Sequence, residues 1–130
     1  MEYSKLRVLI MEDSVYKAMD ITKALEYCGV RDIQRVRNQE AGFELIYDRL
    51  EQGRPIQLIV SDMHYPLAPG EEPNRDAGEI LLSRLRQERL RIPVIICSSQ
   101  NLTEPEALGT VWYNELRDLN RDFKEILNRL

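Results

Sequence analysis

Carboxylates follow two apolar segments of this sequence, and their positions suggest a cation site. Residues 8–11 precede Glu12 and Asp13, and residues 58–61 precede Asp62. If both segments are neighbouring parallel strands, their carboxyl ends lie side by side, about 4.8 Å apart in the pairing direction. Three carboxylates would then meet at one edge of the sheet. Mg²⁺ suits such a cluster, because it is held by one or two carboxylates together with water and phosphate oxygens.

The composition fits one domain without a basic surface for nucleic acid. The chain has 130 residues, of which 43% are apolar, and its 18 basic and 22 acidic residues give a net charge of -4. Nucleic-acid-binding domains usually carry a basic excess instead. No apolar run approaches the roughly 18 residues of a membrane span, and no secretory signal peptide is recognisable. We therefore expect one cytoplasmic domain over residues 1–130, with neither a membrane nor nucleic acid as a direct partner.

The two cysteines, Cys28 and Cys97, stand far apart and form no metal-binding or C-x-x-C spacing. Cys97 lies inside an apolar segment, where cysteine usually behaves as a small buried hydrophobic residue. We expect an inert buried thiol at this position.

Short apolar runs alternate with longer segments of helical period. We expect strands at residues 6–11, 33–36, 56–61, 94–97 and 110–113, helices at residues 14–27, 39–52 and 77–88, and a final helix carrying Leu116, Leu119, Phe123, Ile126, Leu127 and Leu130. Continuous apolar strands are typical of a parallel sheet covered by helices on both faces. With right-handed crossovers, this order predicts an α/β protein with a doubly wound, three-layer architecture.

Two helices should each bury one face, and one long loop should follow Asp62. The inward faces are expected to contain Val15, Ala18, Thr22 and Leu25 in the first helix and Phe43, Ile46, Tyr47 and Leu50 in the second. Residues 65–75 contain three prolines and cannot form a regular element.

The same landmarks resemble the receiver domain of two-component response regulators. The matching positions are the pair Glu12 and Asp13, Asp62 with the segment to Pro66, Ser98 after the fourth strand, and residues 76–81 at the start of the third helix. They occur in the family's order and on the expected elements, and the similarity covers nearly the whole chain. The resemblance implies a flavodoxin-like fold for one receiver-like domain, with a five-stranded parallel sheet of strand order 2-1-3-4-5.

The resemblance also implies how these residues act. Asp62 would accept a phosphoryl group from a histidine kinase or phosphotransfer protein. Asp13, Asp62 and the main-chain carbonyl of His64 would bind Mg²⁺, with Glu12 contributing through water, and Ser98 would hydrogen-bond the phosphoryl group. A protein partner would receive the signal, and a homodimer is an open alternative. Catalysis would be limited to the domain's own phosphorylation and dephosphorylation.

The sequence departs from the family pattern at two places. Receiver domains usually carry a lysine followed by proline near the end of the fifth strand, whereas residues 110–115 contain no lysine and offer Tyr113 or Asn114 instead. Residues 100–109 include Pro105 and leave little room for a helix, so we expect the fourth helix of the family to be reduced to a turn. We expect the adapted interaction surface here and in the long loop after Asp62.

Four other interpretations are open at this stage, two for the whole chain and two for single residues or pairs. The chain could be a pseudo-receiver, a phosphate-independent adaptor that binds a protein, or a Mg²⁺-dependent phosphohydrolase. The pair Glu12 and Asp13 could also simply cap a helix, since acidic residues are favourable near a helix start. His64 could be an ordinary loop histidine.

Overall fold

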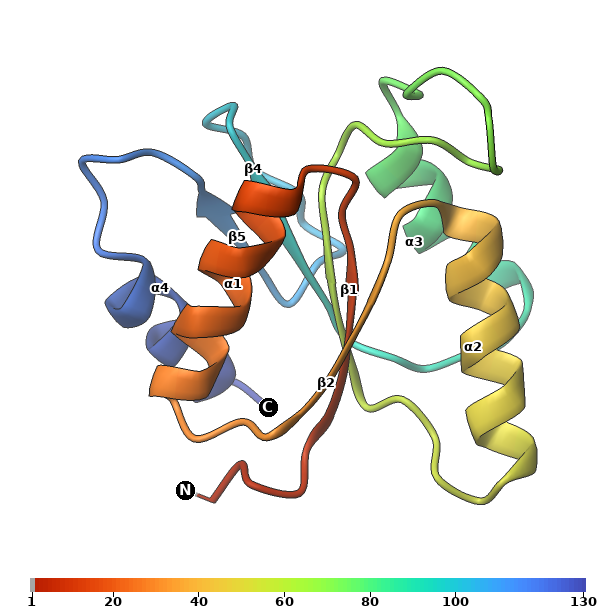
Figure 1. Cartoon of the computed structure of the whole chain (residues 1–130), viewed down its shortest axis with the longest axis horizontal. Helices are drawn as coiled ribbons and strands as arrows, with labels where there is room; N and C mark the ends of the chain where they lie inside the picture. Colours follow the sequence, from red (N-terminus) through yellow and green to blue (C-terminus); the bar gives the residue numbers. More distant parts are fainter. Residues whose placement is uncertain (1) are drawn as a thin grey trace.

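Five parallel strands form one sheet between two layers of helices (Figure 1). The computed structural model describes residues 2–130. Its elements are β1 (Arg7–Met11), α1 (Val15–Tyr27), β2 (Asp32–Val36), α2 (Gln39–Glu51), β3 (Leu58–Ser61), α3 (Ala77–Gln87), β4 (Val94–Ser98), β5 (Gly109–Trp112) and α4 (Leu119–Leu127). The strand order β2-β1-β3-β4-β5 confirms the predicted doubly wound topology. Ligands of such sheets bind at the carboxyl ends of the strands where the order reverses, here at β1 and β3.

Alternate residues of the strands face two separate apolar cores. Val8 and Ile10 of β1 pack under α1 and α4, whereas Leu9 and Met11 pack under α2 and α3. The two helix pairs lie on opposite sides of the sheet in Figure 1. Because both faces are covered, the strands read as continuous apolar runs, as expected. Cys97 is fully buried in the first of these cores, which confirms the expected buried thiol.

Local signals fix both ends of α1. Ser14 caps its N-terminus by accepting a hydrogen bond from the backbone N–H of Lys17 at 3.3 Å. Gly29 follows the helix with φ at +99°, a conformation that only glycine adopts at little cost. The inward face differs from the prediction, because Val15 is exposed at the first turn and Ile21 is buried instead.

The expected apolar stripes of α2 and α4 were too wide. Tyr47 and Leu50 are exposed on α2. The final helix begins only at Leu119, because Asp118 caps it by accepting from the N–H of Arg121, and this leaves Leu116 outside the helix and 91% exposed. Phe123, Ile126 and Leu127 are buried as predicted, whereas Leu130 is exposed.

Two irregular segments flank the carboxyl edge of the sheet. Residues 99–108 contain no helix, which confirms the expected reduction, and their Leu102 and Ala107 pack against the core beneath α2 and α3. The loop after Asp62 is held by the N-terminus of α2, whose Gln39 and Glu40 N–H groups donate to the carbonyls of Pro66 and Leu67. No helix between residues 2 and 130 is long and apolar enough to cross a membrane.

The contrast between Phe123 and Leu116 can be tested by truncation. We expect Phe123→Ala to lower the free energy of unfolding by about 3–5 kcal/mol, because it opens a cavity under α4. Leu116→Ala should change it by less than about 0.5 kcal/mol, because the side chain is exposed. Urea denaturation followed by circular dichroism measures both, and equal losses would contradict the observed start of α4.

Candidate functional site

The paired ends of β1 and β3 bring three carboxylates together. Met11 and Ser61 are register partners, so Glu12 and Asp62 follow directly at the same edge, and the Asp62 N–H donates to the Met11 carbonyl. Oxygens of Glu12, Asp13 and Asp62 all lie within 4.8 Å of one another. Glu12 is buried, Asp62 half-buried and Asp13 exposed. The predicted cluster is therefore present, and it extends from the core to the solvent.

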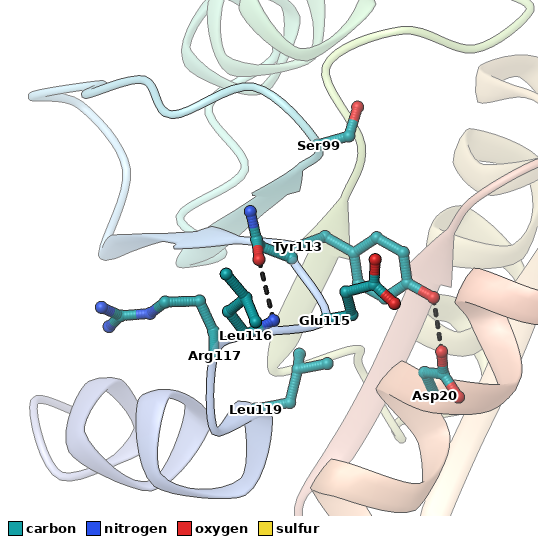
Figure 2. A pocket seen from close by; sticks show the side chains of 8 residues that line it. Asp20, Ser99, Tyr113, Glu115, Leu116, Arg117 and Leu119 are labelled. Carbon is teal, nitrogen blue, oxygen red and sulfur yellow. Dashed lines mark hydrogen bonds between the residues drawn. The ribbon is translucent and has the colours of Figure 1, made fainter.

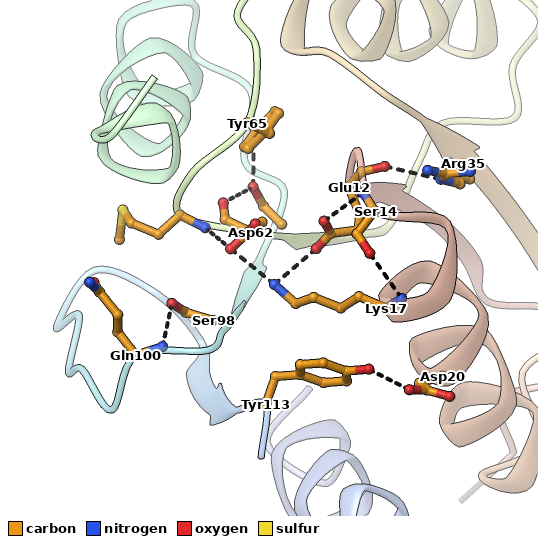
Figure 3. Close-up of polar contacts among 12 residues, drawn as sticks. Glu12, Ser14, Lys17, Asp20, Arg35, Asp62, Tyr65, Ser98, Gln100 and Tyr113 are labelled. Carbon is orange, nitrogen blue, oxygen red and sulfur yellow. Dashed lines mark hydrogen bonds and ion pairs between the residues drawn. The ribbon is translucent and has the colours of Figure 1, made fainter. Parts of the chain in front are cut away.

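A buried lysine that the sequence analysis missed lies inside this cluster. The Nζ atom of Lys17 is 2.9 Å from Oε1 of Glu12 and 3.0 Å from Oδ1 of Asp62 (Figure 3). Lys17 belongs to the first turn of α1 and is only 7% exposed. One signal could have revealed it, since Lys17 lies four residues before Ile21 on the inward face of the helix, where a charged residue needs a partner.

Opposing effects act on the ionisation of this ion pair. Burial lowers the pKa of Lys17, but the carboxylates of Asp62 and Glu12 raise it by more, so its pKa lies above the ordinary value and the ammonium is charged at neutral pH. Burial raises the pKa of Glu12, against the attraction of Lys17. The Ser14 N–H also donates to Oε2 of Glu12 at 3.0 Å. Lys17 thus compensates part of the negative charge at this edge.

The two oxygens of Asp62 have different surroundings. Oδ1 accepts from the Met63 N–H at 2.7 Å and contacts Lys17, whereas Oδ2 accepts no hydrogen bond from residues 2–130. The carbonyl oxygen of His64 likewise has no donor within that range. The carboxylates of Glu12, Asp13 and Asp62 offer the hard oxygen ligands that Mg²⁺ prefers, so these three residues fit such an ion.

Ser98 ends the neighbouring strand β4 and is buried. Its Oγ accepts from the Gln100 N–H at 3.1 Å, and its carbonyl accepts from the Tyr113 N–H at 2.7 Å. The next carbonyl, of Ser99, accepts from the indole N–H of Trp112 at 3.1 Å. Trp112 is exposed rather than part of the core, and its indole is bonded to the loop that follows Ser98.

Tyr113 rather than Asn114 faces the carboxylate cluster. Nζ of Lys17 lies 5.6 Å from the centre of the Tyr113 ring, whose hydroxyl donates to Asp20 of α1. The Asn114 side chain instead accepts from the Leu116 N–H at 2.8 Å and caps the turn after β5. The position after β5 therefore supplies an aromatic neighbour to Lys17 and no charge.

A groove lies beside the carboxylates and not over them. It encloses about 790 Å³ between α1 and the segment after β5, and it is lined by Asp20, Ser99, Tyr113, Asn114, Glu115, Leu116, Arg117 and Leu119 (Figure 2). Tyr113 contributes to this groove and also contacts Lys17. The charged cluster and the groove thus share one wall.

Several solved structures with a similar fold are response regulators or their signal receiver domains. The chain superposes on a DNA-binding response regulator of the LuxR family from Staphylococcus aureus with a TM-score of 0.69 and 17% identity, over 95% of this chain and 97% of the other. The signal receiver domain of an HD domain-containing protein from Pseudomonas fluorescens Pf-5 superposes with a TM-score of 0.67 and 14% identity, over 95% of this chain and 92% of the other. The Mn²⁺-bound form of the response regulator Rcp1 superposes with a TM-score of 0.64 and 18% identity, over 93% of this chain and 91% of the other.

No family profile matches the sequence, and no curated protein sequence matches it. At these low identities, the structural likeness establishes the fold. The chain has the fold of response-regulator receiver domains, as the resemblance in its sequence indicated.

Gly78 keeps α3 close to the backbone beside Asp62. Its N–H donates to the Met63 carbonyl at 3.1 Å, and an added Cβ would lie 3.2 Å from both the Asp62 carbonyl oxygen and Cα of Met63. Contacts with backbone atoms cannot be relieved by a side-chain rotation.

We therefore expect Gly78→Ala to lower the free energy of unfolding by about 1–3 kcal/mol through overpacking, although alanine favours a helix. Glu79→Ala, on the exposed side of the same turn, should change it by less than about 0.5 kcal/mol. Urea denaturation measures the difference, and a Gly78→Ala protein as stable as the original would disprove the close packing.

Proposed function

We propose that this chain is a receiver domain that accepts a phosphoryl group on Asp62 and signals through a protein partner. The observation that carries the proposal is the convergence of Glu12, Asp13 and Asp62 within 4.8 Å at the carboxyl edge of the sheet. Asp62 is half-buried there and has an oxygen without a hydrogen bond from the described residues. The shared fold and the position of Ser98 support the same reaction.

In the proposed reaction, a phosphoryl group moves from an oxygen or nitrogen atom of the donor to an oxygen of Asp62. A carboxylate oxygen of Asp62 attacks the phosphorus of the donor and forms the new P–O bond. The bond from phosphorus to the leaving group breaks, and its electron pair departs with that group. The product is an acyl phosphate on Asp62, and a histidine kinase or phosphotransfer protein is the natural donor. Catalysis by the chain is limited to this transfer and to hydrolysis of its own acyl phosphate.

The metal ligands in this proposal are Asp13, Asp62 and the main-chain carbonyl of His64, with Glu12 acting through water. When bound there, Mg²⁺ would neutralise charge that develops on the phosphoryl oxygens. Ser98 would donate its hydroxyl to the phosphoryl group. Its Oγ now accepts from the Gln100 N–H, so a new contact would alter the start of the irregular segment 99–108.

A phosphate-independent adaptor is the second candidate. It is favoured by the segment 99–108, which contains no helix, and by the absence of a lysine from residues 110–115. In that case the fold would bind a cytoplasmic protein partner without reading the state of Asp62. Measured affinity for a partner would then be the same for the original chain and for Asp62→Ala, with or without a phosphodonor.

Phosphoryl transfer can be measured directly with acetyl phosphate. In the presence of Mg²⁺, intact-mass spectrometry should show one added phosphoryl group on the chain. Asp62→Asn should show none, because the attacking carboxylate is lost. Asp48→Asn removes an exposed carboxylate on α2 and should be labelled like the original chain. An adduct that persists in Asp62→Asn would assign the phosphoryl group to another residue.

Trp112 provides a second measurement, because its indole is bonded to the Ser99 carbonyl. We expect its fluorescence to change when beryllofluoride, a phosphoryl mimic, is added with Mg²⁺. Ser98→Ala should reduce this change, since the hydroxyl that links the mimic to the loop is absent, while mass labelling by acetyl phosphate continues. A full fluorescence response in Ser98→Ala would remove Ser98 from the coupling.

A further inference from the structure

We propose that Lys17 supplies, from α1, the positive charge that binds phosphoryl oxygens on Asp62. Receiver domains usually carry this charge after the fifth strand, where this chain has Tyr113. The inference deepens the proposed function and rests on it. It concerns which side chain supplies the positive charge, and it rests on the position of Nζ of Lys17 between Asp62 and Glu12.

Lys17 already contacts the group that would receive the phosphoryl group. Its Nζ is 3.0 Å from Oδ1 of Asp62, and the side chain is buried. Among residues 2–130, no other cationic side chain contacts any carboxylate of the cluster. A phosphoryl group on Asp62 would be bonded to the same carboxylate, so its oxygens would lie within reach of the Lys17 ammonium.

The balance of charge favours a shift of the Lys17 contact from the Asp62 carboxylate to a phosphoryl oxygen. Glu12, Asp13 and Asp62 carry three negative charges and Lys17 one positive charge, which leaves a net charge of -2. Phosphorylation replaces the single charge of Asp62 by about two charges on the phosphoryl oxygens. An ammonium therefore gains a stronger partner when the proton-free carboxylate becomes an acyl phosphate.

The surroundings of Lys17 leave it able to make this contact. An ammonium has three N–H donors, and the Lys17 ammonium forms two ion pairs, with Glu12 at 2.9 Å and with Asp62 at 3.0 Å. The third neighbour is the face of the Tyr113 ring, which attracts a cation without fixing a hydrogen bond. Glu12 can keep its contact with Lys17 while the Asp62 contact moves to a phosphoryl oxygen.

A structural counter-ion would behave differently in one measurable way. If Lys17 only neutralised Glu12 and Asp62, its removal would strengthen Mg²⁺ binding and leave the binding of a phosphoryl mimic unchanged. If Lys17 binds the phosphoryl oxygens, its removal strengthens Mg²⁺ binding but weakens binding of the mimic. The two ligands thus respond in opposite directions only under the proposal.

The test compares Lys17→Met with the original chain in two titrations. The first measures Mg²⁺ affinity by calorimetry, and the second measures beryllofluoride affinity at saturating Mg²⁺ through Trp112 fluorescence. We expect Lys17→Met to bind Mg²⁺ more tightly than the original and beryllofluoride at least about tenfold more weakly. Lys17→Arg, which keeps the charge, should recover part of that loss.

Lys23→Gln is the matched control, because it removes a lysine from the exposed side of the same helix. It should bind both ligands like the original chain. Urea denaturation with and without Mg²⁺ establishes that each variant is folded. If Lys17→Met does not fold, Lys17→Gln replaces it, since its amide can still donate to a carboxylate.

The outcomes separate this inference from the proposed function. If the original chain takes neither beryllofluoride nor a phosphoryl group, the proposed function is wrong and the inference falls with it. If the original chain binds beryllofluoride and the uncharged Lys17 variant binds it equally well, the receiver function stands and the role of Lys17 is wrong. Opposite changes for Mg²⁺ and beryllofluoride support both.

Discussion

The sheet register forces like charges together, and the site depends on how they are compensated. Pairing of Met11 with Ser61 places Glu12 and Asp62 side by side, with Glu12 almost fully buried. Two carboxylates this close would repel each other strongly away from water. Lys17 offsets this repulsion from within the first turn of α1, and Ser14, which caps that turn, also donates its N–H to Glu12. Helix capping and charge compensation therefore share the same few residues.

Much of the architecture could be predicted from the sequence, because both faces of the sheet are covered. The continuous apolar runs around Ile10 and Val60 fix the strands, and the residues that follow them fix the carboxylate cluster. Lys17 was missed because a lysine on a helix normally reaches solvent. Its spacing of four residues from Ile21 indicated an inward position, but only the fold shows that its side chain points to Asp62. The same limit explains Leu116. Its apolar character suggested that it belongs to the final helix, but Asp118 caps that helix and the helix begins at Leu119.

The loop after Asp62 is long, but it is firmly tied to the rest of the fold. Tyr65 is fully buried, and its hydroxyl contacts Ser61 and the Gln39 side chain. Burial raises the pKa of this phenol to about 12, so it remains protonated at neutral pH. Gln39 also donates to the Ala77 carbonyl at the start of α3. The network joins β3, α2 and α3 directly behind Asp62.

All charged side chains of the cluster come from the part of the chain before α3. Glu12, Asp13, Lys17 and Asp62 all precede α3, and Tyr113, the later residue that contacts Lys17, is uncharged. Substitutions between Ser99 and Leu108 therefore leave all four charged side chains in place, whereas a change at Tyr113 would alter the surroundings of Lys17. New recognition loops could therefore replace the segment 99–108, which contains no helix, while Glu12, Asp13, Lys17 and Asp62 are kept.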